Sequence, residues 1–353
     1  MKLVPLKRLI LRGMRFWKNP SYKDLSDKSW ILAPPPKSPK SSKAIYLNNQ
    51  LGKVVSVATN HALEHARITG NWQEFRPTTT YLLKSPVLAN GFVYKNAMKM
   101  PLIKTQESMV LSGDYERLDE AVLTSSYVSN LYFCHFIQDE LPLILLGQKL
   151  GEPITVARKA YDHEPAYRDF FDLHTRQVNS AKCKKLVVID DIAWNDDKAE
   201  RYETLRTRLK NLIPSSKPLG AFFRRGRSGD LRLLENESEV ENFLEQQGFV
   251  ILDPQQSSAR EMMEKSMGAE IIAGVEGSQL APGLLAVKDR GTVLTLQPPN
   301  RFNNIYKVVT DSLEMAYSFV VGSPTQQGFS IDIDELARTL ELVLLKSQTG
   351  GKT

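Results

Sequence analysis

The chain has 353 residues, 42% hydrophobic and 24% charged, which is the composition of an ordinary soluble globular protein with enough length for two domains. Its net charge of +6 gathers at the start, because residues 1–45 hold eleven Lys or Arg and two Asp, leaving 35 basic and 38 acidic residues for the rest. A nucleic-acid-binding protein is expected to carry a basic stripe on its folded part, so this class is disfavoured. The two cysteines, Cys134 and Cys183, allow at most one disulfide, so the fold does not depend on disulfides and a reducing compartment is favoured.

The first residues, MKLVPLKRLILRGMRFWKN, place apolar side chains among Lys and Arg at roughly helical spacing. Their longest apolar run, Leu9 to Leu11, is too short for a membrane span or a signal-peptide core. Two alternatives stay open: residues 1–18 lie on an anionic membrane surface as an amphipathic helix, or they form an ordinary helix packed on the body. Residues 33–43 are rich in Pro, Ser and Lys, which is typical of a semi-rigid linker, so residues 1–43 are predicted to be a basic head and its linker.

Residues 44–123 predict a mainly antiparallel β section, because short β-type runs alternate with turn signals such as Asn90-Gly91. The runs are AIYL (44–47), KVVSVA (53–58), TTTYLL (78–83) and GFVY (91–94). HALEH, at residues 61–65, fits the H-x-x-E-H pattern of a group of zinc peptidases. That pattern needs a helix and a third acidic ligand, so among predicted strands we interpret it as coincidence and keep a zinc peptidase as the weaker alternative.

From residue 130 onward, predicted helices and strands alternate. The first series is helix 135–150, strand 153–159, helix 164–174, strand 184–191 and helix 198–213. After a break at residues 213–220, the second series is strand 220–225, helix 237–248, strand 249–254, helix 258–268, strand 270–275, helix 280–287 and strand 292–298. Such alternation predicts two units with parallel, Rossmann-type sheets. Ligands bind beyond the carboxyl ends of these strands, so the loops after Phe223, Pro254, Val275 and Pro298 form the expected functional edge.

His135 and Asp139 are four residues apart and therefore share one face of the first helix of this series. A histidine next to a carboxylate is a natural general base at neutral pH. Structural alternatives remain, because His135 could be a buried core residue and Asp139 could cap a helix whose first turn holds Pro142. Spacing alone favours the structural alternatives.

Residues 224–232, RRGRSGDLR, follow a predicted buried strand and hold four arginines separated by glycines. Planar guanidinium donors and close backbone approach suit a diphosphate, whereas the alternative is a solvated charged loop. Asn236 with Glu239 three residues later predicts a capping box, which gives Asn236 a structural role. Further on, AEIIAGVEGSQLAPGLLAV (269–287) reads as a buried strand that turns sharply into a helix. Such turns often hold phosphates, but Glu276 would repel one.

Three motifs occur in the order found in glycosyltransferase family 61, and the chain resembles its bacterial capsular polysaccharide biosynthesis branch over about residues 120–310. The first motif matches Asn130, His135, Phe136, Asp139, Leu141 and Pro142, and the second matches Arg224 or Arg225, Arg232, Asn236 and Glu237. The third is usually His-Gly-Ala/Ser-x-Leu, and here it reads Glu276-Gly277-Ser278-Gln279-Leu280.

The resemblance implies an α/β fold of the GT-B type, with two Rossmann-like parallel-sheet domains facing a cleft and a β-rich N-terminal section. Residues 44–214 would be the acceptor-side domain and residues 215–353 the domain that binds the nucleotide sugar. The implied reaction is the inverting transfer of a hexosyl or pentosyl group from a nucleotide sugar to a hydroxyl of a glycan or lipid-linked acceptor in surface polysaccharide synthesis. It implies no cofactor and no essential metal. The cysteine content favours a cytoplasmic location, and the membrane alternative for residues 1–18 would place the protein peripherally at the inner face of the membrane.

The resemblance also implies roles for the motif residues. His135 would be the general base, with Asp139 orienting it or acting as the base itself. The donor-binding residues would be Arg224, Arg225, Arg232, Asn236, Glu276, Gly277 and Ser278. The arginines would stabilise the leaving diphosphate, Gly277 and Ser278 would open backbone N–H groups to the donor, and Glu276 would accept hydrogen bonds from sugar or ribose hydroxyls. Because Glu276 replaces the usual His, a non-catalytic interaction protein on the same fold at the membrane is the alternative.

Overall fold

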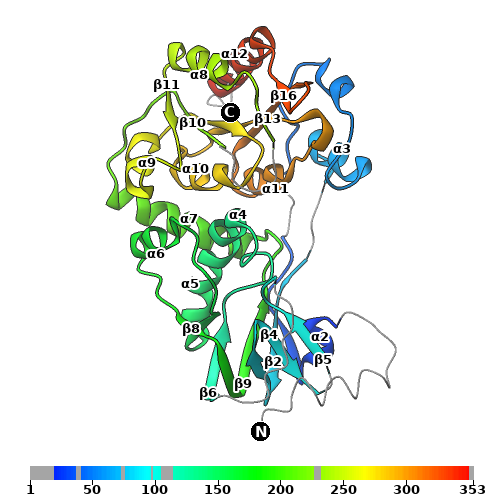
Figure 1. The fold of residues 1–353 in the computed structure, drawn as a ribbon, viewed down its shortest axis with the longest axis vertical. Helices are drawn as coiled ribbons and strands as arrows, with labels where there is room; N and C mark the ends of the chain where they lie inside the picture. Colours follow the sequence, from blue (N-terminus) through cyan, green and yellow to red (C-terminus); the bar gives the residue numbers. More distant parts are fainter. Residues whose placement is uncertain are drawn as a thin grey trace. The chain divides into compact units, whose positions relative to one another are not determined.

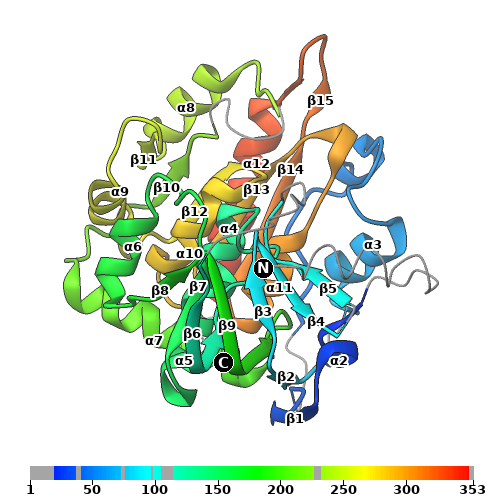
Figure 2. The same ribbon diagram turned by 60° about the horizontal axis from the view of Figure 1, so that its bottom comes forward.

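The computed structural model describes residues 20–36, 41–72, 76–96, 98–104, 114–225 and 232–349. They form two compact units (Figures 1 and 2). Unit 1 takes in the described residues of 1–36 and 75–202, and unit 2 those of 37–74 and 203–353. The last of the three boundaries falls inside helix α7 (Asp196–Leu212). Residues 1–19 of the predicted head lie outside the described residues. Within the described ranges, no helix is both long enough and apolar enough to cross a membrane.

Unit 1 is built on a nine-stranded mixed sheet, as far as the described residues go, in the order β5-β4-β3-β9-β6-β7-β8, with β2 also paired to β9 and β1 to β2. The strands are β1 (Lys28–Ala33), β2 (Thr78–Lys84), β3 (Val87–Ala89), β4 (Phe92–Lys95), β5 (Met98–Pro101), β6 (Glu116–Leu123), β7 (Pro153–Val156), β8 (Arg176–Val178) and β9 (Ser180–Asp190). Strands β6 to β9 run parallel to one another, whereas β1 to β5 are joined by antiparallel pairings. The predicted antiparallel section is therefore confirmed for β2 to β5.

The hairpin between β3 and β4 turns at Asn90 and Gly91, which have φ angles of 52° and 72°. Two consecutive positive φ values are what a tight two-residue hairpin needs, and Asn-Gly adopts them readily. The predicted strands at 44–47 and 53–58 are wrong. Ile45 and Val57 form isolated bridges to Ser318 and Phe302 instead, and neither segment extends into a ladder.

Helices cover the sheet of unit 1. They are α2 (Tyr22–Leu25), α4 (Phe133–His135), α5 (Leu141–Leu150), α6 (Glu164–Phe171) and the first part of α7. On one face, Leu143 and Leu146 of α5 pack against Val122 and Ile189. On the other face, Leu25 of α2 joins a core formed by residues of the strands. Cys134 and Cys183 are both thiols, so no disulfide constrains this unit.

Unit 2 contains a five-stranded parallel sheet in the order β11-β10-β12-β13-β14. Its strands are β10 (Gly220–Phe223), β11 (Phe249–Leu252), β12 (Ile271–Val275), β13 (Thr292–Gln297) and β14 (Ala316–Val321), and a small hairpin pairs β15 (Ser323–Pro324) with β16 (Phe329–Ser330). The helices are α3 (His61–Thr69), α8 (Glu237–Gln246), α9 (Ala259–Ser266), α10 (Ala281–Ala286), α11 (Ile305–Ser312) and α12 (Ile333–Thr349). The second alternating series is thus confirmed, and with it the expectation of an α/β protein with parallel-strand sheets.

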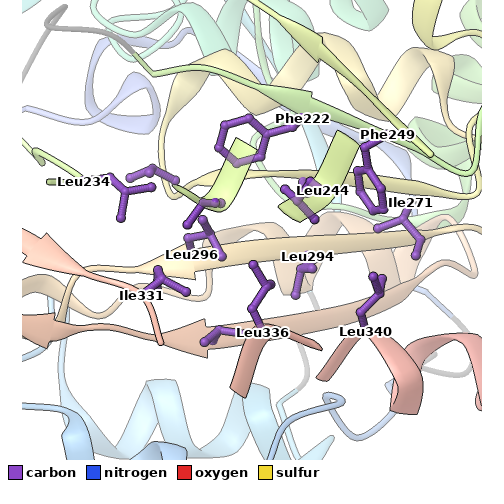
Figure 3. Close-up of a cluster of buried hydrophobic side chains, with 14 of the residues drawn as sticks. Phe222, Leu234, Leu244, Phe249, Ile271, Leu294, Leu296, Ile331, Leu336 and Leu340 are labelled. Atoms are coloured by element: carbon purple, nitrogen blue, oxygen red, sulfur yellow. The ribbon is translucent and has the colours of Figure 1, made fainter. Parts of the chain in front are cut away.

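Both faces of the unit 2 sheet are buried, as a parallel sheet requires. Leu244 of α8 and Leu336 and Leu340 of α12 pack on one face, against strand residues that include Phe222 and Leu294 (Figure 3). On the opposite face, α10 lies so close that a Cβ on Gly283 would come within 2.4 Å of Ile272. In Figure 1, α8 and α12 lie above this sheet and α9, α10 and α11 lie below it.

Strand β10 lies between β11 and β12, the next two strands along the chain. The connections that leave the carboxyl ends of β10 and β12 therefore diverge at this point of the sheet. In open α/β sheets, such a switch point is the usual place for a ligand. Here it is bordered by Arg224 and Arg225, which follow β10, and by Glu276 and Gly277, which follow β12.

Candidate active site

His135 and Asp139 lie on one helical run that contains a π-helical turn, Phe136–Glu140, between α4 and α5. Pro142 has no N–H to donate to the carbonyl four residues before it, and the turn that precedes it is widened. The N–H of Leu141 accordingly donates to the carbonyl of Phe136, five residues back. Asp139 lies inside this turn, so the alternative that it caps a helix is wrong. Wide turns of this kind are frequent at functional sites.

The imidazole of His135 and the carboxylate of Asp139 are in contact, with 2.5 Å between Nδ1 and Oδ2. The His135 side chain is 24% exposed, so it is not the fully buried core histidine of the structural alternative. When Nδ1 carries the proton that Asp139 accepts, Nε2 is the basic nitrogen. The geometry therefore suits a general base held in one tautomer by a carboxylate.

Sequence reasoning missed the second partner of Asp139, which is Lys198 in the first turn of α7. Its Nζ donates to Oδ1 of Asp139 and to the backbone carbonyl of Asp191, and its side chain is fully buried. Burial by itself would raise the pKa of Asp139, but Lys198 and His135 outweigh burial and lower that pKa. Asp139 is therefore ionised, with both of its oxygens engaged.

The turn that leads into this helix is held by a buried polar network. Asn130, the first residue of the family motif, donates to the carbonyl of Leu102 and accepts from Nε of Arg158 at 2.8 Å. Glu140 accepts from Arg168 at 2.6 Å and from Ser129 at 2.8 Å. These contacts give Asn130 a structural role in the turn that precedes the helix of His135.

In unit 2, Arg225, Arg232 and Arg301 meet at Glu276, and we call these three residues the arginine cluster. The Oε2 atom of Glu276 accepts from NH1 of Arg232 and from NH1 of Arg301, the latter at 3.1 Å. The backbone carbonyl of Glu276 accepts from Arg232 at 2.6 Å and from Arg225 at 3.2 Å. Asn303 donates to Oε1 at 3.1 Å. Arg301 and Asn303 lie beyond β13, and the sequence around Glu276 does not indicate that they contact it.

The arginine cluster and Glu276 shift each other's pKa values. Burial raises the pKa of Glu276, although the three guanidinium groups act in the opposite direction. Burial, together with Arg232, lowers the pKa of Arg225 to about 10, which leaves it cationic at neutral pH. Among the described contacts, three guanidinium groups thus meet around the single carboxylate and backbone carbonyl of Glu276.

Gly277 keeps room for the arginine cluster. A Cβ at this position would lie 1.6 Å from NH1 of Arg225, so any larger residue would displace that side chain. The Gly277 carbonyl accepts from the hydroxyl of Tyr306 at 2.7 Å. Ser278 follows and opens a 3₁₀ turn, Ser278–Leu280, that leads into α10.

Arg224 and Asn236 have other partners. The guanidinium of Arg224 pairs with the carboxylate of Glu241 on α8, at 2.5 Å from Nε. The side chain of Asn236 donates to the carbonyl of Ile331 at 2.8 Å and accepts from its N–H at 2.9 Å. The predicted capping box is therefore wrong: Asn236 occupies the cap position of α8 and its amide donates to Oε2 of Glu239 at 2.9 Å, but its side chain accepts no hydrogen bond from the helix backbone.

The HALEH segment forms the start of α3 rather than a strand, with Asn60 as its cap. His61 and His65 are exposed, whereas Glu64 is buried and accepts from Arg67 at 2.8 Å and from the N–H of Asn304 at 2.7 Å. The carboxylate thus points away from the side that the histidines occupy. Across the described residues, no group of three His, Cys, Asp or Glu side chains could hold a metal ion.

Comparison with known proteins agrees with this geometry. Residues 133–294 match the model of the family Glycosyltransferase 61, a segment that holds His135, Asp139, Arg225, Arg232 and Glu276. No curated protein matches the chain. The predicted resemblance is therefore confirmed over residues 133–294, which carry a segment similar to glycosyltransferase family 61, whereas the capsular polysaccharide branch stays a prediction.

Proposed function

We propose that this protein is an inverting glycosyltransferase that moves a sugar from a nucleotide-sugar donor to a hydroxyl of a glycan or lipid-linked acceptor. The observation that carries the proposal is the arginine cluster at the switch point of the unit 2 sheet. A nucleotide sugar has a negative charge on each of its two phosphates, and guanidinium groups bind phosphate oxygens through paired, charge-assisted hydrogen bonds. Surface polysaccharide synthesis, a GT-B arrangement and a peripheral cytoplasmic location belong to the same proposal and rest on the family resemblance.

Arg225 and Arg232 are the residues we assign to the donor diphosphate. When the bond from the anomeric carbon to the phosphate oxygen breaks, the departing nucleoside diphosphate gains a negative charge. Guanidinium groups fixed beside that oxygen stabilise it more than they stabilise the donor, which lowers the barrier. Gly277 and Ser278 would let the donor approach the backbone, and the carboxylate of Glu276 would accept hydrogen bonds from a donor hydroxyl.

His135 is the general base of the proposed reaction. Nε2 takes the proton of the acceptor hydroxyl as its oxygen attacks the anomeric carbon, while Asp139 holds Nδ1–H and stabilises the imidazolium that forms. Of the two roles left open for Asp139, its two engaged oxygens support orientation rather than proton transfer. A single displacement of this kind inverts the anomeric carbon and needs no covalent enzyme intermediate.

The test is nucleotide binding. Calorimetry with UDP, GDP and CDP should detect binding of at least one nucleotide by the wild-type protein. Arg225→Ala should weaken it by about tenfold or more, since a hydrogen bond to a charged group contributes about 1.5–3 kcal/mol. Arg260→Ala is the matched control, because Arg260 pairs with Glu264 on the exposed side of α9. If the wild-type protein binds none of the three nucleotides, the proposal fails and the non-catalytic alternative takes its place.

A further inference from the structure

We propose that Lys198 is a positioning residue that acts through Asp139 to keep His135 uncharged, and therefore able to accept a proton, at neutral pH. The catalytic meaning of this inference rests on the proposed function. The effect of Lys198 on the charge of His135 does not depend on that function, because it concerns the protein without a bound donor.

The contacts of Lys198 are those of a fixed cation. Its ammonium group is fully buried and faces three oxygens, Oδ1 of Asp139 and the backbone carbonyls of Asp191 and Ile192, the last two at 2.8 and 3.4 Å. Three donors thus meet three acceptors, which is the arrangement that stabilises a buried charge. Asn195 fixes the backbone from which Lys198 extends, by accepting from its N–H at 3.0 Å.

One carboxylate therefore serves two partners. A buried carboxylate that faced a histidine alone would draw a proton onto the ring, and the resulting imidazolium could not act as a base. With Lys198 balancing its charge, Asp139 still accepts the Nδ1–H bond and fixes the tautomer, yet it stabilises the imidazolium far less. Orientation and basicity are in this way controlled separately.

In the described part of the chain, the other charged side chains packed around the helical run have partners of opposite charge. They form their own ion pairs, which are Glu140 with Arg168, Glu164 with Arg158, and Asp191 with Arg201. Tyr132 presents its ring, whose centroid is 6.0 Å from that of His135. Lys198 is accordingly the cation that sets the charge felt at His135 through Asp139.

The test is a proton NMR titration of the full chain with ¹³C-labelled histidine rings, in which the signal of His135 is identified by its loss in His135→Gln. In Lys198→Met, the pKa of His135 should rise by about one unit or more relative to wild type. Lys185→Met is the matched control, because Lys185 lies at an exposed ion pair with Glu120, and it should leave the titration unchanged. An unchanged or lower His135 pKa in Lys198→Met overturns the inference.

A second pair of variants keeps the test decisive, because Lys198→Met leaves a buried carboxylate without its cation and thereby threatens folding. In the Asp139→Asn background, adding Lys198→Met should move the His135 pKa by much less than one unit. An equal rise in both backgrounds would show that Lys198 acts directly on the ring, against the inference. The titration uses no donor, so its result is independent of nucleotide binding. If the His135 pKa rises in Lys198→Met but the wild-type protein binds no nucleotide, only the proposed function is refuted. If the protein binds a nucleotide but the His135 pKa does not rise, only the role of Lys198 is refuted.

Discussion

Arg224 and Arg225 are neighbours in the sequence, yet their side chains serve different parts of unit 2. The chain is extended where it leaves β10, so consecutive side chains point to opposite sides. Arg224 reaches Glu241 and lies 3.6 Å from Asp253, while Arg225 reaches Gln279 and the carbonyl of Glu276. The family motif fits either arginine, and only the three-dimensional contacts separate them.

Arg224→Ala should therefore affect mainly the stability of the protein, and Arg225→Ala mainly its affinity for the nucleotide. Arg224→Ala leaves the carboxylate of Glu241 without its partner and should lower the melting temperature by about 2–4 °C, with nucleotide affinity within about twofold of wild type. Arg225→Ala should lose affinity with little change in melting temperature. Thermal unfolding and calorimetry on the same samples measure both effects. Equal losses of affinity would mean that Arg224 also contacts the donor.

Single residues were predictable where their relationship is local. His135 and Asp139 are one helical turn apart, so their contact follows from spacing. Lys198 is 59 residues from Asp139, and Arg301 is 25 residues from Glu276. Their contacts depend on how separate elements pack, and a single sequence does not encode that packing in any readable spacing.

Elements of the second α/β series were predictable because their strands are buried on both faces and read as continuous apolar runs. The extent of the helical run 135–150 was also right, apart from its start at Phe133. Its π-helical turn was not foreseen, because periodicity distinguishes helix from strand but not one helical width from another. Residues 53–58 misled for a different reason, since this apolar run is not buried in a sheet: it forms one isolated bridge, and Val55 is 64% exposed.

Packing of α10 on the sheet gives a prediction at the scale of elements. In Gly283→Ala, the new Cβ would lie 2.4 Å from Ile272 and 3.1 Å from Phe223. Overpacking costs about 1–3 kcal/mol, which exceeds the roughly 1 kcal/mol that alanine gains over glycine in a helix. The variant should therefore melt a few degrees below wild type. Gly52→Ala is the control in the same unit, since its Cβ meets nothing within 4 Å, and it should be neutral or slightly stabilising. A Gly283→Ala protein as stable as Gly52→Ala would show that α10 can shift to make room.

At the scale of the whole molecule, each compact unit is built from segments that are not continuous in the sequence. Residues 41–72 belong to unit 2, where Ser42 bonds to Asp311, Gln50 to Glu335 and Glu64 to Asn304. Each of these contacts joins residues more than 200 positions apart. Composition and local patterning carry no information about such partners, so the discontinuous division could not have been read from the sequence.

The net positive charge of the whole molecule comes from its first 19 residues, which can be deleted. Residues 1–19 hold six Lys or Arg and no acidic residue, so the other 334 residues balance at 40 basic and 40 acidic. If the head binds an anionic membrane, deleting residues 2–19 should abolish most of the sedimentation with vesicles that contain phosphatidylserine, by about tenfold or more, because each basic residue near such a surface contributes about 1 kcal/mol. The deletion should stop at residue 19, since Ser21 caps α2 and β1 pairs with β2.

Two controls make the vesicle experiment specific. Vesicles of phosphatidylcholine alone should bind neither form, and raising the salt concentration should release the full chain, since screening weakens attraction between exposed charges. The truncated protein should keep the nucleotide affinity of wild type, which shows that its units are intact. Unchanged sedimentation of the truncated protein would mean that residues 2–19 do not mediate the binding, and the interpretation of the head as a membrane-binding segment would then be wrong.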